Sequence, residues 1–209
     1  MEIGVWLALI GLFFAGGLTP GPAVMLVMSS ALRYGFRPAL LPAVGISAAN
    51  LVWITLAASG AATLAARFPT ILLALKLAGL GFIGWLAWSL ATRTPDRVDA
   101  SADAAPARGK LFAYGFGLQL SNPNALVFFG LLLPAYIDPA RAVIPQALII
   151  MATVTATEMF GLSAYAAAAD AMNRRFANAA FVRRFNLLAA TAMFATAAFA
   201  VWATQGNTL

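Results

Sequence analysis

Cysteine and histidine are both absent from this chain of 209 residues. Without cysteine there is no disulfide, no thiolate nucleophile and no cysteine-type metal site. Without histidine the chain lacks the commonest metal ligand and the usual general base near neutral pH. The carboxylates form no catalytic pair on one predicted helix, and phosphate-binding and dinucleotide-binding motifs are missing from the sequence. We therefore expect no enzyme, no bound cofactor, no metal site and no direct use of ATP.

Charge is also scarce in this sequence. Charged residues make up 10% of the chain, whereas a soluble domain has about 25%, and 62% of the residues are hydrophobic. This small number of charges cannot cover a surface that faces water. We therefore expect the lipid bilayer to surround most of the chain. The formal net charge is +6. The basic residues are dispersed between apolar runs, which indicates membrane orientation and not nucleic-acid binding.

Six apolar runs predict an all-α integral membrane protein with six transmembrane helices, because a span needs about 20 apolar residues. The runs cover about residues 3–32, 39–65, 70–91, 111–136, 142–169 and 185–203. Residues 93–110 form the one long polar stretch, which predicts a flexible connection between a first half, about 1–92, and a second half, about 111–209. The chain opens Met-Glu-Ile without a positive segment, so we expect the first run to be a retained span and not a cleaved signal peptide.

Basic residues also predict the orientation of the spans. The connections after the first, third and fifth runs hold Arg33, Arg37, Arg93, Arg97, Arg108, Lys110, Arg174, Arg175, Arg183 and Arg184. The connections on the other side hold only Arg67 and Arg141. Because Lys and Arg are enriched in cytoplasmic loops, we expect a multi-pass protein with both termini outside.

Prolines interrupt the first and fourth runs. The two stretches are "GGLTPGPAVMLV" at residues 16–27 and "LQLSNPNALVFFG" at residues 118–130. In each, a good N-cap residue precedes a proline, Thr19 before Pro20 and Asn122 before Pro123. Proline is well placed as the first residue of a helix, so each stretch predicts the end of one half-helix and the start of another. A pair of simple proline kinks is the alternative.

Breaks at matching positions in spans one and four predict a 3+3 inverted repeat with a binding site near the bilayer midplane. The N-terminus of each new half-helix carries partial positive charge and attracts an anionic group such as a carboxylate. The predicted substrate-binding residues are Thr19, Pro20, Gly21, Pro22, Asn50, Asn122, Pro123 and Asn124.

Glu158 lies within the fifth apolar run. A central acidic residue costs about 2.5–3.5 kcal/mol on insertion scales, so it usually faces the bundle interior and is functional. We expect Glu158 to carry a proton or to bind a cationic group, and a structural hydrogen bond is the alternative. Asn50, in the second run, binds either a ligand or another helix. Lys76, inside the third run, either pairs with an ion partner such as Glu158 or snorkels to the interface. Weaker candidates are Gln119, Asn124 and Trp53.

Small residues recur at helical spacing on two predicted spans. The two ridges are Ala57, Ala61 and Ala65, and Ala192, Thr196 and Ala200. Such ridges let helices approach closely in lipid. We expect packing within the chain, and a contact between two copies in a homodimer is the alternative.

Three stretches taken together resemble the LysE/RhtB family of bacterial amino-acid exporters. They are "GLTPGPAVMLVMSSALRYGFRPAL", "ALKLAGLGFIGWLAWSL" and "FGLQLSNPNALVFFG", and the resemblance covers nearly the whole chain. The positions that match the family motifs are Pro20, Gly21, Pro22, Lys76, Gly79, Asn122, Pro123 and Phe128. Many members of the family have an acidic residue near the position of Asn50, which leaves Glu158 as the main intramembrane acid here.

The resemblance implies a single transmembrane transporter domain over residues 1–209. It implies a secondary transporter that exports amino acids or related small zwitterions across the bacterial inner membrane by proton antiport. The expected partners are the bilayer, the amino acid and protons. A passive channel for small solutes and a metal-cation exporter of the same superfamily are the alternatives. In the expected mechanism, the half-helix N-termini hold the substrate carboxylate, Glu158 binds the ammonium group or a proton in turn, and the two halves rock.

Overall fold

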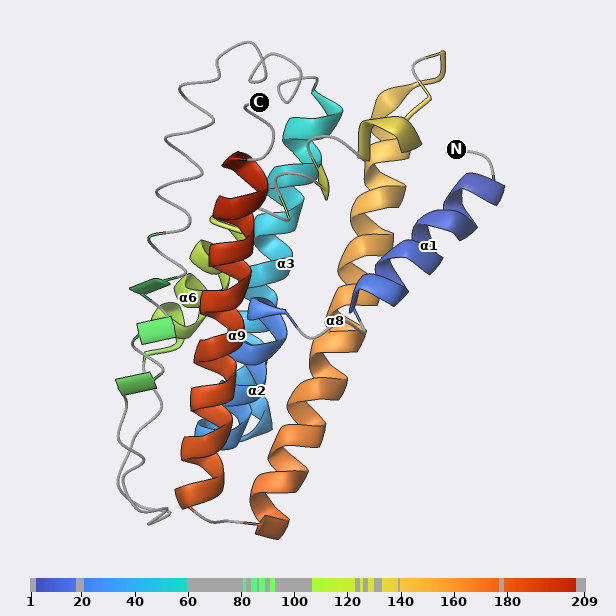
Figure 1. Ribbon diagram of the computed structural model, residues 1–209. Helices are drawn as coiled ribbons and strands as arrows, with labels where there is room; N and C mark the ends of the chain where they lie inside the picture. The colour runs from blue at the N-terminus through green and yellow to red at the C-terminus, as the bar shows by residue number, and fades with distance from the viewer. Residues whose placement is uncertain are drawn as a thin grey trace.

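The computed structural model describes residues 3–17, 21–59, 107–122, 133–138, 140–176 and 179–205, together with residues 81, 84–85, 87–88, 91–92, 125 and 128–129. In this part of the chain the fold is all-α, without a strand (Figure 1). The helices are α1 (Ile3–Gly17), α2 (Pro22–Tyr34), α3 (Phe36–Ala58), α6 (Arg108–Leu120), α8 (Val143–Phe176) and α9 (Ala179–Gln205), with a short 3₁₀ helix, η2 (Leu133–Tyr136).

Two of the described helices are long and apolar enough to cross a membrane. They are α3, with 23 residues, and the part of α8 from Val143 to Asn173, with 31 residues. Most of the predicted third span, which includes Lys76, lies outside the described residues. The predicted all-α class is therefore confirmed, whereas six spans and an inverted repeat remain predictions.

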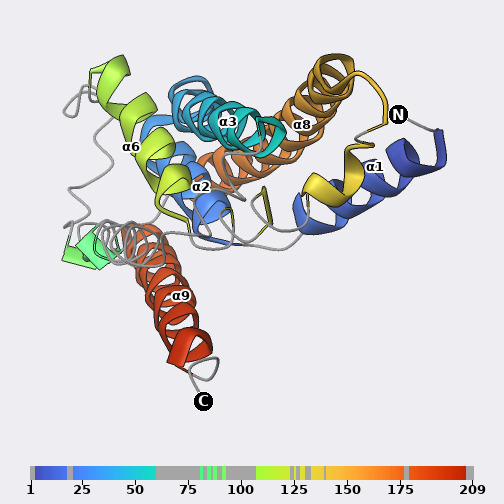
Figure 2. The ribbon, with the colours of Figure 1, turned by 90° about the horizontal axis from the view of Figure 1, so that it is seen from above.

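Helix α2 lies at the centre of the described bundle, where it packs against α3, α8 and α9. Seen from above, α6, α3, α8 and α1 follow one another in a row, and α9 lies on the other side of α2 (Figure 2). The indole Nε1 of Trp6 on α1 donates a hydrogen bond to Thr153 Oγ1 on α8, at 2.9 Å. Ala57 of the first predicted ridge is buried in the same core cluster as Leu9 and Trp53, so it packs within the chain.

Helices α3 and α6 run parallel and touch through their backbones. A Cβ atom added at Gly115 would collide with the carbonyl group of Pro42, and one added at Gly45 would collide with the carbonyl oxygen of Phe112. Glycine is therefore required at both positions, because any side chain would separate the two helices. This contact holds α6 in register with α3 up to the level of Asn50 and Gln119, whose side chains meet at 2.7 Å.

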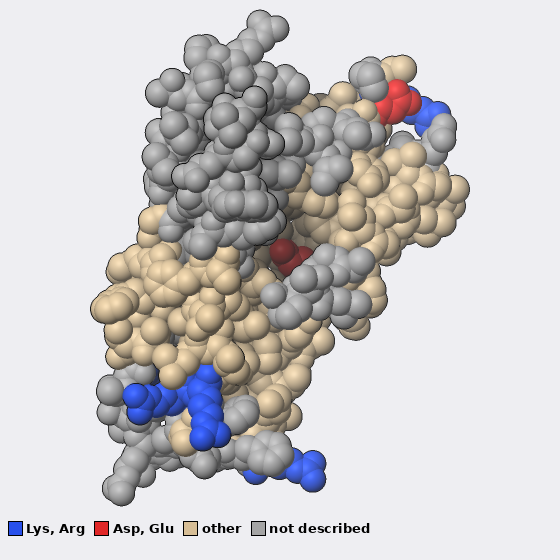
Figure 3. All heavy atoms as spheres, viewed as in Figure 1, with Lys and Arg blue, Asp and Glu red and all other residues tan. Residues whose placement is uncertain are grey.

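A tight turn at Gly35 connects α2 to α3. Gly35 has φ 84° and ψ 176°, a backbone conformation that is essentially restricted to glycine. Its N–H donates to the carbonyl oxygen of Ala31 at 2.9 Å, which ends α2. The turn brings Arg33 and Arg37 to one end of the molecule, where basic side chains gather (Figure 3). This end holds the close of α2 and α8 and the start of α3, α6 and α9.

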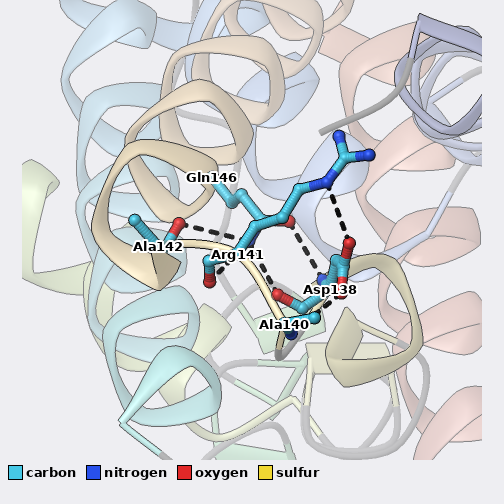
Figure 4. Close-up of polar contacts among 5 residues, drawn as sticks. All are labelled: Asp138, Ala140, Arg141, Ala142 and Gln146. Atoms are coloured by element: carbon cyan, nitrogen blue, oxygen red, sulfur yellow. Dashed lines mark hydrogen bonds and ion pairs between the residues drawn. The ribbon is translucent and has the colours of Figure 1, made fainter.

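At the opposite end, the side chain of Gln146 fixes the loop that connects η2 to α8 (Figure 4). Its Nε2 donates to the carbonyl oxygens of Asp138 and Ala142, at 2.9 and 3.2 Å, and its Oε1 accepts the Asp138 N–H at 3.0 Å. Gln146 is only 2% exposed, so these backbone groups replace water as its partners. Arg141 Nε and Asp138 Oδ2 form an exposed ion pair at 3.1 Å beside it.

Candidate functional site

The predicted break in the first apolar run is present between α1 and α2. Helix α1 ends at Gly17 and α2 begins at Pro22, with Gly21 as an N-cap residue in an extended conformation (φ −113°, ψ −174°) and no side-chain cap. The predicted start at Pro20 with Thr19 as the cap is therefore wrong by two residues. Gly21 and Pro22 offer the same combination of cap and proline, and Pro22 loses no hydrogen bond as the first helical residue.

The start of α2 leaves backbone donors facing the break. The first intrahelical bond runs from the N–H of Met25 to the carbonyl oxygen of Gly21, at 3.0 Å. The N–H groups of Ala23 and Val24 therefore have no intrahelical acceptor. Together with the helix dipole they make this point favourable for a negatively charged group.

The fourth apolar run is also interrupted. Helix α6 ends at Leu120, Ser121 is its C-cap, and Asn122 is not helical. The carbonyl oxygen of Asn122 accepts the N–H of Ala125 at 3.0 Å. The role of Asn122 as an N-cap stays a prediction, because Pro123 and Asn124 lie outside the described residues.

A line of hydrogen bonds joins this second break to Glu158. Asn122 Nδ2 donates to Gln119 Oε1 at 3.2 Å, Gln119 Nε2 donates to Asn50 Oδ1 at 2.7 Å, and Asn50 Nδ2 donates to Glu158 Oε2 at 2.7 Å. These three bonds connect α6, α3 and α8. Every donor points toward the carboxylate, which is the direction that a negatively charged Glu158 favours.

The two oxygens of the Glu158 carboxylate differ in their hydrogen-bond partners. Oε2 accepts hydrogen bonds from Asn50 and from Ser47 Oγ, the latter at 3.0 Å. No described residue donates to Oε1. Since Glu158 lines a cavity, Oε1 is the oxygen that can bind a proton or a cation there.

The start of α2 and the carboxylate of Glu158 both line one cavity of about 450 Å³. In Figure 3, acidic atoms lie inside a hollow at mid-height of the molecule. The polar part of the lining comprises Gly21 at the start of α2, Asn50, Gln119, Asn122 and Glu158. The apolar part comprises Leu12, Phe13, Pro22, Ala23, Val24, Ala125, Phe128, Phe129, Gly161 and Leu162. A helix N-terminus and a carboxylate therefore face the same space.

Most of the described residues that the sequence singled out lie around this cavity. Gly21, Pro22, Asn50, Asn122 and Glu158 all line it, as does the motif residue Phe128. The remaining predicted site and motif residues lie outside the described part of the chain: Thr19, Pro20, Lys76, Gly79, Pro123 and Asn124.

Sequence reasoning underestimated Gln119 and missed Ser47 and Phe13. Gln119 occupies the middle of the polar line, although it ranked as a weak candidate. Ser47 precedes Asn50 by three residues and therefore lies on the same face of α3, which is the signal that identifies it. Phe13 sits in an apolar run among similar residues and carries no such signal.

The described residues contain no group of three or more side chains suited to holding a metal ion. The cavity offers one carboxylate and three neutral amide side chains, from Asn50, Gln119 and Asn122. A small polar molecule with separated charges matches this set of groups better than a metal cation does, because divalent cations take more oxygen ligands.

Comparison with known proteins places the chain among transporters. The LysE type translocator family matches residues 14–204. A membrane protein of Vibrio cholerae, named as uncharacterized, is 30% identical over 173 residues, which cover 80% of this chain and 83% of that protein. No solved structure matches the chain.

Two further relatives have names that state an activity. The homoserine/homoserine lactone efflux protein of Salmonella typhimurium is 29% identical over 157 residues, covering 73% of this chain and 74% of that protein. The cysteine/O-acetylserine efflux protein of Salmonella choleraesuis is 30% identical over 173 residues, covering 83% of this chain and 85% of that protein. The family match extends over most of the sequence and agrees with a membrane transporter, not an enzyme. The chain therefore belongs to the LysE type translocator family.

Proposed function

We propose that this chain exports amino acids, or related small zwitterions, across the bacterial inner membrane. The observation that carries the proposal is the cavity between the start of α2 and Glu158. The N-terminus of α2 attracts the carboxylate of the substrate, and Glu158 attracts its ammonium group. One site for each charge is what a zwitterion requires.

The named relatives support the choice of substrate class. Homoserine and cysteine, which appear in the names of two efflux proteins, are both small amino acids. Each carries an α-ammonium and an α-carboxylate group, so each matches the two charged ends of the cavity. Export is the direction that these names give.

Proton antiport is the proposed source of energy. Glu158 binds the ammonium group and a proton in turn at Oε1, so that release of one accompanies uptake of the other. The line through Asn50 and Gln119 then links the charge of Glu158 to Asn122 at the break in the fourth run. When the carboxylate is neutral, it is a weaker acceptor for the N–H of Asn50. The hydrogen bond that joins Glu158 to this line on α3 and α6 then weakens.

The proposed topology is a single transporter domain with six spans, arranged as a 3+3 inverted repeat with both termini outside. Helix α1 starts and α9 finishes toward the same end of the molecule, which supports an even number of crossings (Figure 1). The basic side chains gather at the other end, which supports a cytoplasmic location for that end (Figure 3). The two interrupted runs support the repeat.

Transport by the purified protein in liposomes tests the proposal. Liposomes loaded with a panel of unlabelled amino acids are supplied with the same labelled compound outside, with and without a pH gradient. We expect saturable exchange for at least one amino acid and a dependence of net flux on the gradient. Protein-free liposomes are the control. If no amino acid in the panel moves under either condition, the proposed function is wrong.

A further inference from the structure

One wall of the cavity consists of phenylalanine rings. Phe13 on α1 lies against Phe128 with ring centroids 4.9 Å apart in an edge-to-face arrangement, and Phe128 lies 5.3 Å from Phe129. Phe13 and Phe129 are 6.1 Å apart, so the three rings form one cluster. All three line the cavity, together with the aliphatic side chains of Leu12 and Leu162. This wall offers van der Waals contact and no hydrogen bond.

Among the described residues that line the cavity, the charges match one ammonium and one carboxylate group. Glu158 is the one charged side chain among the described residues that line it. The start of α2 supplies partial positive charge at one further point. A second charge, on the side chain of a bound amino acid, would find no partner among these described residues, and burying an unpaired charge is strongly unfavourable.

The amide groups of the cavity are already engaged with one another. Asn50 donates to Glu158 and accepts from Gln119, and Gln119 also accepts from Asn122. A hydroxyl or amide on the substrate side chain would bind to the remaining N–H groups or lone pairs of these amides. An apolar side chain instead leaves the polar line intact and fills the space beside the rings.

We propose that the cavity selects neutral amino acids with an apolar side chain, which packs against Phe13, Phe128 and Phe129. This inference rests on the proposed function and adds the substrate class to it. Glu158, at the end of the line of hydrogen bonds, and the start of α2 bind the ammonium and carboxylate groups that all amino acids share. The aromatic wall distinguishes one amino acid from another.

A competition experiment in proteoliposomes tests the selectivity. Exchange of one transported amino acid is measured against unlabelled leucine, methionine, serine, lysine and glutamate. We expect leucine and methionine to compete at concentrations at least tenfold lower than serine, and we expect lysine and glutamate not to compete. Transport that favours serine, lysine or glutamate would refute the inference and leave the proposed function intact. If no amino acid moves, the proposed function fails and the inference fails with it.

Ring truncation identifies the wall that makes the selection. In Phe13→Ala, we expect KM for leucine to rise at least tenfold while KM for alanine changes less than twofold, because only the larger side chain reaches the ring. Phe160→Ala is the matched control, since Phe160 is 66% exposed and does not line this cavity. Phe13→Leu, a smaller change in volume, covers the case in which the alanine variant does not fold. An equal rise in KM for leucine and alanine in the folded variants would contradict the inference.

Discussion

Replacing Glu158 by glutamine separates the charge of this side chain from its shape. The amide oxygen of glutamine can still accept the hydrogen bonds that Asn50 and Ser47 make to Oε2, at 2.7 and 3.0 Å. The volume of the side chain is almost unchanged, so the contact between α3 and α8 remains. The negative charge and the ability to bind a proton are both lost.

The expected effect on binding follows from the energies of hydrogen bonds. A hydrogen bond to a charged group contributes about 1.5–3 kcal/mol, and a neutral one contributes about 0.5–1.5 kcal/mol. Loss of the charge therefore weakens the interaction of position 158 with a substrate ammonium group by about 1–2 kcal/mol. This difference corresponds to a rise in KM of roughly 5- to 30-fold.

The effect on energy coupling is larger, because an amide does not accept a proton at physiological pH. We expect Glu158→Gln to lose the response of net flux to a pH gradient while it keeps a weaker exchange of amino acids. Both quantities are measured in proteoliposomes. The matched control is Asp138→Asn, which makes the same chemical change at an exposed carboxylate at the end of the molecule. Unchanged KM together with full coupling to the gradient in Glu158→Gln would show that Glu158 plays no part in transport.

Three further substitutions test the fold that positions the site. Gly115→Ala should lower the thermal unfolding midpoint in detergent, because its Cβ would collide with Pro42 and such overpacking costs about 1–3 kcal/mol, whereas Gly109→Ala on the same helix meets no atom within 4 Å and should have little effect. Gly35→Ala should also destabilise the protein, by about 1–3 kcal/mol, because alanine rarely adopts φ 84°. Gln146→Leu should cost about 1–3 kcal/mol by leaving backbone groups of the loop unpaired, and a midpoint equal to that of the unchanged protein would contradict this role.

The sequence predicted those parts of the site where a residue contrasts with its surroundings. Glu158 and Asn50 stand out because polar side chains are costly in an apolar run. The prolines predict the interruption of the first and fourth runs. The first helical residue was predicted at Pro20 instead of Pro22, because "TPGP" contains two adjacent pairs that both suit a helix start. Local preference alone does not choose between them.

Residues that resemble many others in the chain could not be predicted in the same way. Ser29 and Ser30 bond to carbonyl oxygens one turn earlier in their own helix, at 2.6 and 2.8 Å, whereas Ser47 bonds to Glu158. Only the spacing of three residues between Ser47 and Asn50 distinguishes these two uses of serine in the sequence. Likewise, Gly45 and Gly115 are two of 17 glycines, and only the packing of α3 on α6 identifies them.

The backbone contact between α3 and α6 has a consequence for the proposed transport cycle. Gly45 and Gly115 bring the backbones of α3 and α6 into direct contact, so we expect the two helices to move together as one unit, here called the α3–α6 plate. This plate contains parts of both the first and the second half of the sequence. Rocking the halves past each other would shear it. In the proposed transport cycle, we therefore expect α1 and α8 to move against the plate, which would change the distance between Glu158 and Asn50.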